Sequence, residues 1–225
     1  MARRTDDEPD VSAPISIAAH ADSSPETSVA AMLADLGRSA RSAPLQFEGA
    51  GTSVGADADR EHESLCRERA ELGYLLCRSL RARRVVAFGC AVSAIVQLAA
   101  AMRDNGGGIV VAVATDSRAI TFAHAALQAA GIAGFVEFRH HDARSALGDL
   151  GGDVDFAVID TIGAGEACLN GIDVMRIVAP QMQGGAIALL GDIGPEPIAW
   201  MRTPVNGFRS MRLPLAGATE LSVKA

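Results

Sequence analysis

Val85-Val86-Ala87-Phe88-Gly89 is a short apolar run that stops at a glycine, which is typical of a buried strand followed by a tight turn. The next segment, from Ser93 to Arg103, is apolar and long enough for a helix. Asp104-Asn105-Gly106-Gly107-Gly108 then ends that helix with strong turn residues, and Ile109 to Val113 is a second apolar run. A strand, a helix and a second buried strand in this order predict a parallel pair joined by a crossover helix.

The same alternation continues to the end of the chain. It predicts helices over residues 117–130 and 165–178, and strands over residues 135–138, 154–160 and 185–190. The tail from Phe208 to Lys224 alternates around Pro214 and Gly217, which indicates two antiparallel strands joined by a turn. We therefore predict an α/β fold: a Rossmann-like, doubly wound, mostly parallel seven-stranded sheet with a C-terminal antiparallel hairpin and helices on both faces.

The first sixty residues differ from this regular pattern. Residues 1–27 are rich in Asp, Ser, Pro and Ala without a sustained period, which predicts a disordered N-terminal tail. Residues 28–60 predict a short helix followed by a loop, and residues 61–225 carry the folded domain. The domain begins with a predicted helix over residues 61–80, whose apolar stripe consists of Leu65, Leu72, Leu75, Leu76 and Leu80.

The composition excludes several classes of protein. The chain has 225 residues, of which 49% are hydrophobic, so it can bury a substantial core. The formal net charge of −7 argues against a nucleic-acid or anionic-membrane binder, which would usually carry a basic excess. No apolar run approaches the roughly 20 residues that a membrane span needs. Four cysteines without C-x-x-C spacing fit reduced thiols, so we expect a cytoplasmic protein.

The chemistry of a doubly wound sheet is expected at the carboxyl ends of its strands, where the order of the strands reverses. Glycine in the first turn lets backbone N–H groups approach a ligand, and an acidic residue after the second strand usually binds a ribose. The strand-end residues that become candidates are Gly89 to Ser93, Ala114 to Asp116, His141-Asp142, Asp160 and Gly191-Asp192.

Several of these segments resemble a known family. Leu72-Gly73-Tyr74-Leu75-Leu76, residues 82–89, residues 99–108 and Asn206-Gly207-Phe208-Arg209-Ser210 are similar, in order and spacing, to segments of class I S-adenosylmethionine-dependent methyltransferases. The likeness is to the small bacterial O-methyltransferases related to catechol O-methyltransferase, and it runs from about Leu72 to the C-terminus. It implies S-adenosyl-L-methionine as cofactor, a small hydroxylated acceptor and a homodimer. The cofactor-binding residues that it implies are Gly89, Cys90, Ala91, Ser93, Ala114, Thr115, Asp116, Asp142, Ala143 and Asp160.

The cofactor motif of this chain departs from the family pattern. The family has Glu-Phe-Gly and a further glycine at the first strand, whereas Ala87 replaces the acidic residue here and no second glycine follows Gly89. The acidic residue that would bind the ribose aligns with Ala114, and Asp116 lies two residues later. A carboxylate on a ribose is worth about 1.5–3 kcal/mol, so its loss would weaken cofactor binding.

The metal motif departs as well. In the family members that use a divalent cation, one Asp ends the fourth strand and an Asp-Asn pair ends the fifth. Asp160 matches the first ligand, and the pair aligns with Gly191-Asp192, so Asp160 and Asp192 would hold Mg²⁺ weakly. Asp160 is also the expected catalytic residue, because it would hold the cation or orient the acceptor hydroxyl. Residues 161–166 contain no counterpart of the family's general-base lysine.

Two hypotheses from different classes follow. The first is an S-adenosylmethionine-dependent O-methyltransferase that acts on a small hydroxylated acceptor. The second is a catalytically degenerate methyltransferase fold that serves as a binding or partner subunit, because the departures cluster at Ala87, Ala91, Ala114 and Gly191 while the core pattern is intact. A nicotinamide-binding protein is disfavoured, because the G-x-G-x-x-G fingerprint is absent.

Several candidate residues could have a structural role, such as helix capping or core packing, in place of a role in the site. Asp142 could serve as the N-cap of a helix from Ala143 to Leu147, which is compatible with a place beside the cofactor. Trp200 could either cover the substrate pocket or pack in the core, and His124 lies within a predicted helix.

Overall fold

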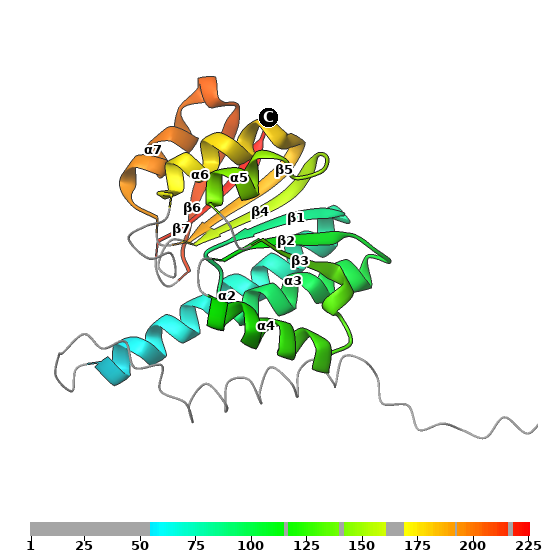
Figure 1. Cartoon of the computed structure of the whole chain (residues 1–225). Helices are drawn as coiled ribbons and strands as arrows, with labels where there is room; N and C mark the ends of the chain where they lie inside the picture. Colours follow the sequence, from blue (N-terminus) through cyan, green and yellow to red (C-terminus); the bar gives the residue numbers. More distant parts are fainter. Residues whose placement is uncertain (1–54, 115–116, 140–141, 161–168, 192, 216–217) are drawn as a thin grey trace, which may run out of the picture.

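The computed structural model describes residues 55–114, 117–139, 142–160, 169–191, 193–215 and 218–225. These residues form a seven-stranded sheet in the order β3-β2-β1-β4-β5-β7-β6 (Figure 1). The strands are β1 (Arg84–Phe88), β2 (Ile109–Val113), β3 (Val136–Arg139), β4 (Val154–Asp160), β5 (Met182–Gly191), β6 (Phe208–Leu213) and β7 (Thr219–Lys224). The first five are parallel to their neighbours, whereas β7 pairs antiparallel with both β5 and β6. The predicted fold class is confirmed.

Helices cover both faces of this sheet (Figure 1). They are α2 (Gly55–Leu80), α3 (Val92–Asp104), α4 (Ser117–Ala129), α5 (Ala143–Gly148), α6 (Gly171–Val178) and α7 (Pro195–Arg202), with short 3-10 segments η1 (Ala133–Phe135), η2 (Ala179–Gln181) and η3 (Pro204–Asn206). One buried core lies between the sheet and α2, α3 and α4, and the other lies between the sheet and α5, α6 and α7. From β1 the next strands are added on one side of the sheet as far as β3, and the chain then returns to add β4 on the other side of β1. The switch point of the doubly wound fold therefore lies between β1 and β4, which are parallel neighbours.

Helix α2 differs from the prediction in its start and in its buried face. It begins at Gly55, so the boundary predicted at residue 61 falls inside a helix. Leu75 and Leu80 of the predicted apolar stripe are exposed. The buried positions follow a row of small residues with one arginine: Arg69, Ala70, Gly73 and Cys77. A Cβ on Gly73 would lie 3.6 Å from Leu98 Cδ2, so the small residues let α2 lie close to α3.

The second half of the chain holds two further differences. Helix α6 begins at Gly171, where the side chain of Asn170 accepts a hydrogen bond from the backbone N–H of Asp173 and caps the helix. The predicted start at residue 165 lies outside the described residues. Helix α7 was not predicted, although Pro195 occupies its first turn, where proline is well tolerated.

None of the described helices is long and apolar enough to cross a membrane.

Candidate active site

The turn from β1 to α3 forms one wall of the candidate site. Gly89 adopts φ +65°, a left-handed conformation that favours glycine, and its N–H lies 3.4 Å from the carbonyl oxygen of Val113. Ala91 is the N-cap of α3 and makes no side-chain hydrogen bond to the first turn of this helix. Ser93 lies half-buried in that turn. The exposed backbone donors of an uncapped helix favour an anionic group of a ligand.

Cys90 points from this turn toward β4. Its Sγ lies 3.5 Å from the carbonyl oxygen of Phe88 and 3.6 Å from that of Val158, and the side chain is half-buried. A small pocket opens beside it, between the first turn, α2, α3 and the end of β4. The residues that line it are Arg69, Ala70, Gly73, Cys90, Ala91, Ala94, Leu98, Val158 and Asp160.

A buried ion pair forms the polar end of this pocket. Arg69 Nη2 of α2 donates a hydrogen bond of 2.8 Å to Asp160 Oδ2 at the end of β4. The Arg69 side chain is 4% exposed and the Asp160 side chain 10%, so both charges are removed from bulk water. A guanidinium stays protonated in proteins, and it compensates the buried carboxylate. The structure thus places Asp160 in the pocket, as predicted, but couples it to an arginine that the sequence analysis missed.

Gly191 at the end of β5 makes room for the guanidinium. It pairs with Asp160 in the parallel register of β4 and β5. A Cβ built on Gly191 would lie 2.7 Å from Arg69 Nε, 2.8 Å from Cζ and 3.0 Å from Cδ. Because real Cβ atoms do not approach other heavy atoms this closely, Arg69 can hold this position only while residue 191 has no side chain.

Thr219 on β7 extends the polar end of the site by one strand. It is directly opposite Gly191 in the antiparallel pair, and opposite residues share a face of a sheet. Its side chain therefore points to the face on which Arg69 lies. Thr219 is fully buried, and its Oγ1 has no hydrogen-bond partner in the described part of the chain. Buried hydroxyls without a partner are uncommon in folded proteins, so Thr219 is a candidate polar contact for a bound ligand.

The remaining predicted cofactor residues lie at the ends of β2 and β3. The N–H of Ala114, directly after β2, lies 3.4 Å from the carbonyl oxygen of Arg139. Asp142 caps α5 by accepting hydrogen bonds from the backbone N–H and the hydroxyl of Ser145, which lower the pKa of its carboxyl. Ala143 follows it and is buried. Thr115, Asp116, His140, His141 and Asp192 lie outside the described residues.

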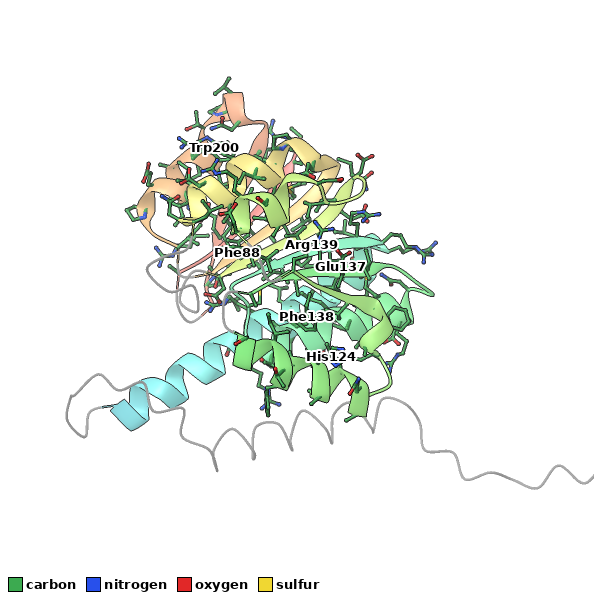
Figure 2. All side chains as sticks on the ribbon, in the orientation of Figure 1. Phe88, His124, Glu137, Phe138, Arg139 and Trp200 are labelled. Carbon is green, nitrogen blue, oxygen red and sulfur yellow. The ribbon has the colours of Figure 1, made fainter. Side chains whose placement is uncertain are left out.

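The two aromatic candidates lie away from the pocket. Trp200 on α7 packs with its ring centroid 6.1 Å from that of Phe208, in the core on the opposite face of the sheet (Figure 2). Core packing therefore explains this tryptophan. His124 of α4 lies 6.3 Å from the Phe138 ring, between a helix and an edge strand (Figure 2). Neither residue belongs to the pocket lining.

Comparisons of the whole chain with known proteins agree with this architecture. No family model and no curated protein matches the sequence. Among solved structures, a methyltransferase from Geobacter sulfurreducens is 20% identical, covers 85% of this chain and 98% of its own, and superimposes with a TM-score of 0.60. The O-methyltransferase TomG from Streptomyces achromogenes, in complex with SAM, is 16% identical over 80% of this chain and 92% of its own, with a TM-score of 0.57.

A third structure is similar in the same way. The O-methyltransferase from Bacillus cereus, in complex with SAH, is 14% identical over 87% of this chain and 91% of its own, with a TM-score of 0.60. Each of these likenesses covers at least 80% of this chain. The chain therefore has the Rossmann-like fold of the class I S-adenosylmethionine-dependent O-methyltransferases.

Proposed function

We propose that this protein is an S-adenosylmethionine-dependent O-methyltransferase that acts on a small hydroxylated acceptor. The observation that carries the proposal is the pocket at the carboxyl ends of β1 and β4, the switch point at which sheets of this kind bind ligands. The pocket joins the cofactor turn, through Cys90 and Ala91, to a buried carboxylate at Asp160. Two proteins of similar fold carry SAM or SAH in their structures, which supports the same cofactor here.

The described residues fit such a cofactor at the first turn. Gly89, Cys90, Ala91 and Ser93 would line its methionine portion, because the uncapped N-terminus of α3 favours a carboxylate. Ala114 with Thr115 and Asp116 would lie along the ribose, and Asp142 with Ala143 would lie beside the adenine. These assignments rest on the strand-end positions of the residues.

In a methyl transfer of this kind, the protein mainly positions the two reactants and places charged side chains beside them. S-adenosylmethionine supplies a methyl group on a positively charged sulfur. The acceptor oxygen forms a bond to the methyl carbon as the carbon–sulfur bond breaks, sulfur keeps the electron pair, and the acceptor proton passes to water. Asp160 would orient the acceptor hydroxyl, because it lies at the polar end of the pocket that begins at Cys90. Holding the reactants in line contributes by proximity and orientation.

Calorimetric titration with S-adenosylmethionine and with S-adenosylhomocysteine tests the proposal. We expect micromolar binding of both. Absence of binding up to about a millimolar, a free energy near 4 kcal/mol, would overturn the enzymatic function and favour the degenerate fold acting as a partner subunit.

Cysteine alkylation read out by peptide mass spectrometry localises the ligand. Cys90 lines the pocket, whereas Cys77 is fully buried in the core. Burial raises the pKa of the Cys77 thiol, which keeps it unreactive. We expect S-adenosylhomocysteine to slow alkylation of Cys90 and to leave Cys77 unmodified throughout. Binding without protection of Cys90 would place the cofactor elsewhere.

Homodimerisation and a cytoplasmic location stay predictions.

A further inference from the structure

The described residues at the ends of β4 and β5 do not fit a divalent cation. Mg²⁺ needs hard oxygen ligands in near-octahedral geometry. Asp160 Oδ2 instead accepts a hydrogen bond from Arg69 Nη2, and Gly191 occupies the first position of the pair that the resemblance assigns to metal binding, whereas Asp192 lies outside the described residues. Within the described ranges, no three His, Cys, Asp or Glu side chains gather in a group that could hold a metal ion.

Arginine at position 69 and glycine at position 191 depend on each other. A side chain at residue 191 would overlap the guanidinium of Arg69, since even its Cβ would lie within 3.0 Å of three atoms of that arginine. A carboxylate at residue 191 and the observed position of Arg69 are therefore mutually exclusive.

The guanidinium also repels any cation that approaches Asp160. It carries a permanent positive charge, it is 4% exposed, and it contacts the carboxylate directly. Electrostatic repulsion between buried like charges is strong, because little water screens it. Among the described residues, the guanidinium of Arg69 already compensates the buried carboxylate of Asp160.

We propose that Arg69 is the fixed cation of this active site, and that it binds the reacting oxygen of the acceptor in place of a divalent metal. The inference rests on the proposed function for the identity of the reaction. A guanidinium presents several N–H donors in a planar fork, and Arg69 and Asp160 both line the pocket that begins at the cofactor turn. Arg69 would bind the acceptor oxygen once its proton has passed to water, before that oxygen bonds to the methyl carbon.

This assignment restricts the class of acceptor. A single positive charge that is shared with Asp160 lowers the pKa of a bound hydroxyl less than a divalent metal ion does. The acceptor hydroxyl must therefore be acidic by itself, as in a phenol or an enol, and a simple aliphatic alcohol is disfavoured. Thr219, whose buried hydroxyl faces the same side of the sheet beside Gly191, offers a second polar contact to such an acceptor.

Titration of the full-length protein with Mn²⁺, followed by electron paramagnetic resonance, tests the absence of a metal. We expect no saturable binding at millimolar Mn²⁺ by the wild type. The double variant Arg69→Met/Gly191→Asp removes the guanidinium and restores a carboxylate, so its affinity for Mn²⁺ should rise at least tenfold. Arg67→Met removes an exposed arginine of the same helix and should bind no more Mn²⁺ than the wild type. Saturable wild-type binding that Asp160→Asn abolishes would overturn the inference.

Binding of 4-nitrophenolate to the protein saturated with S-adenosylhomocysteine tests the cationic role. Arg69→Met should weaken this binding at least tenfold, and Arg69→Lys, which keeps the charge but not the fork, should weaken it less. The double variant Arg69→Met/Asp160→Asn removes both charges of the buried pair. It replaces Arg69→Met in the binding measurement if that single variant does not fold. Equal binding by wild type and these variants, including no binding by any, would overturn the role.

The two titrations separate the inference from the proposed function. Binding of S-adenosylhomocysteine together with specific Mn²⁺ binding at Asp160 would leave the methyltransferase function in place and remove only the role of Arg69. Failure to bind S-adenosylhomocysteine would remove the proposed function, whatever Mn²⁺ does.

Discussion

Two arginine–carboxylate pairs lie on opposite faces of the sheet, both near the carboxyl ends of β4 and β5, and they differ in their surroundings. On one face, Arg69 of α2 reaches Asp160 through one hydrogen bond of 2.8 Å, and both side chains are buried beside a pocket. On the other face, Arg202 of α7 holds Glu220 of β7 through two hydrogen bonds of 2.7 and 2.8 Å. Glu220 is fully buried, whereas the Arg202 side chain is 49% exposed.

The difference separates a structural pair from a functional one. Arg202 is solvated on its outer side and binds Glu220 with both arms of its fork, which is the arrangement that fixes a helix to a sheet. Arg69 is enclosed and beside Gly191, which has lost its side chain, and next to Thr219, whose hydroxyl has no partner among the described residues. A buried charge pair, a glycine without a side chain and a buried hydroxyl thus lie together on one face beside the pocket, which favours a binding site there.

Removal of Arg69 should produce the largest loss of stability. Arg69→Met leaves the Asp160 carboxylate buried without its guanidinium, and breaking a buried pair in this way costs about 3–5 kcal/mol. Adding Asp160→Asn removes the buried charge and should recover most of that loss. Urea denaturation of the two variants measures both effects, with Arg67→Met as the exposed control. Equal stability of Arg69→Met and the wild type would show that the pair is not buried.

A side chain at residue 191 should have the next largest effect. Gly191→Ala places a Cβ against the guanidinium of Arg69, which is held by Asp160, so we expect a loss of about 1–3 kcal/mol from overpacking. In an Arg69→Met background the same substitution should cost less, because the shorter apolar side chain can move. Gly134→Ala, where a Cβ would meet nothing within 4 Å, is the matched control. Additive effects of the two substitutions would contradict the contact.

The sequence was sufficient for the fold because the strands are nearly continuous apolar runs. Residues 109–113 and 154–160, for example, coincide with β2 and β4 as predicted. Helix α7 was missed because Pro195 and Pro197 are strong turn signals, although proline is compatible with a first helical turn. Leu75 was assigned to the buried stripe of α2, and the structure exposes it, because small residues instead make the close contact with α3.

The site could be predicted only in part. Asp160 follows an apolar strand, and this position alone identifies it. Arg69 is 91 residues away in sequence, and no local pattern joins the two. A signal was nevertheless present: Arg69 lies three residues before Leu72 and seven before Leu76, at a helical spacing that puts a charge on the apolar side of α2. An arginine in an apolar stripe together with a glycine in place of a carboxylate is the pattern to seek in other sequences.

Two neighbouring residues of β7, one on each face of the sheet, differ in whether their polar side chains are hydrogen-bonded. Glu220 faces Arg202 and is satisfied, whereas the hydroxyl of Thr219 is buried without a partner among the described residues. Thr219→Val keeps the shape and removes the hydroxyl, so it should stabilise the protein without ligand by about 1 kcal/mol. Thermal unfolding measures the change, and a lower melting temperature would mean that the hydroxyl is satisfied in the folded protein.

An exposed cluster away from both faces gives the smallest effect and a pH signature. Tyr74 donates a hydrogen bond of 2.8 Å to Asp104, which also pairs with Arg103. Burial opposes ionisation of Asp104, but the hydrogen bonds from Arg103 and Tyr74 outweigh it and hold the pKa of this carboxyl below its ordinary value. Burial and the hydrogen bond to Asp104 raise the pKa of Tyr74.

The signs of these shifts fix the pH window in which the cluster contributes. A lowered carboxyl pKa stabilises the fold above the unfolded value of about 4 and ceases to do so as the pH falls through the folded pKa. A raised tyrosine pKa contributes below the unfolded value of about 10 and is lost as the pH rises through the folded value. Tyr74→Phe should therefore cost a few tenths of a kcal/mol near pH 7, since solvent screens the cluster, and the difference should vanish toward pH 2. Urea denaturation at both pH values measures it. If the stability difference between Tyr74→Phe and the wild type does not depend on pH, it comes from packing of the tyrosine ring. The hydrogen bonds at Asp104 would then contribute nothing measurable, and only the two buried arginine–carboxylate pairs would remain as stabilising ion pairs.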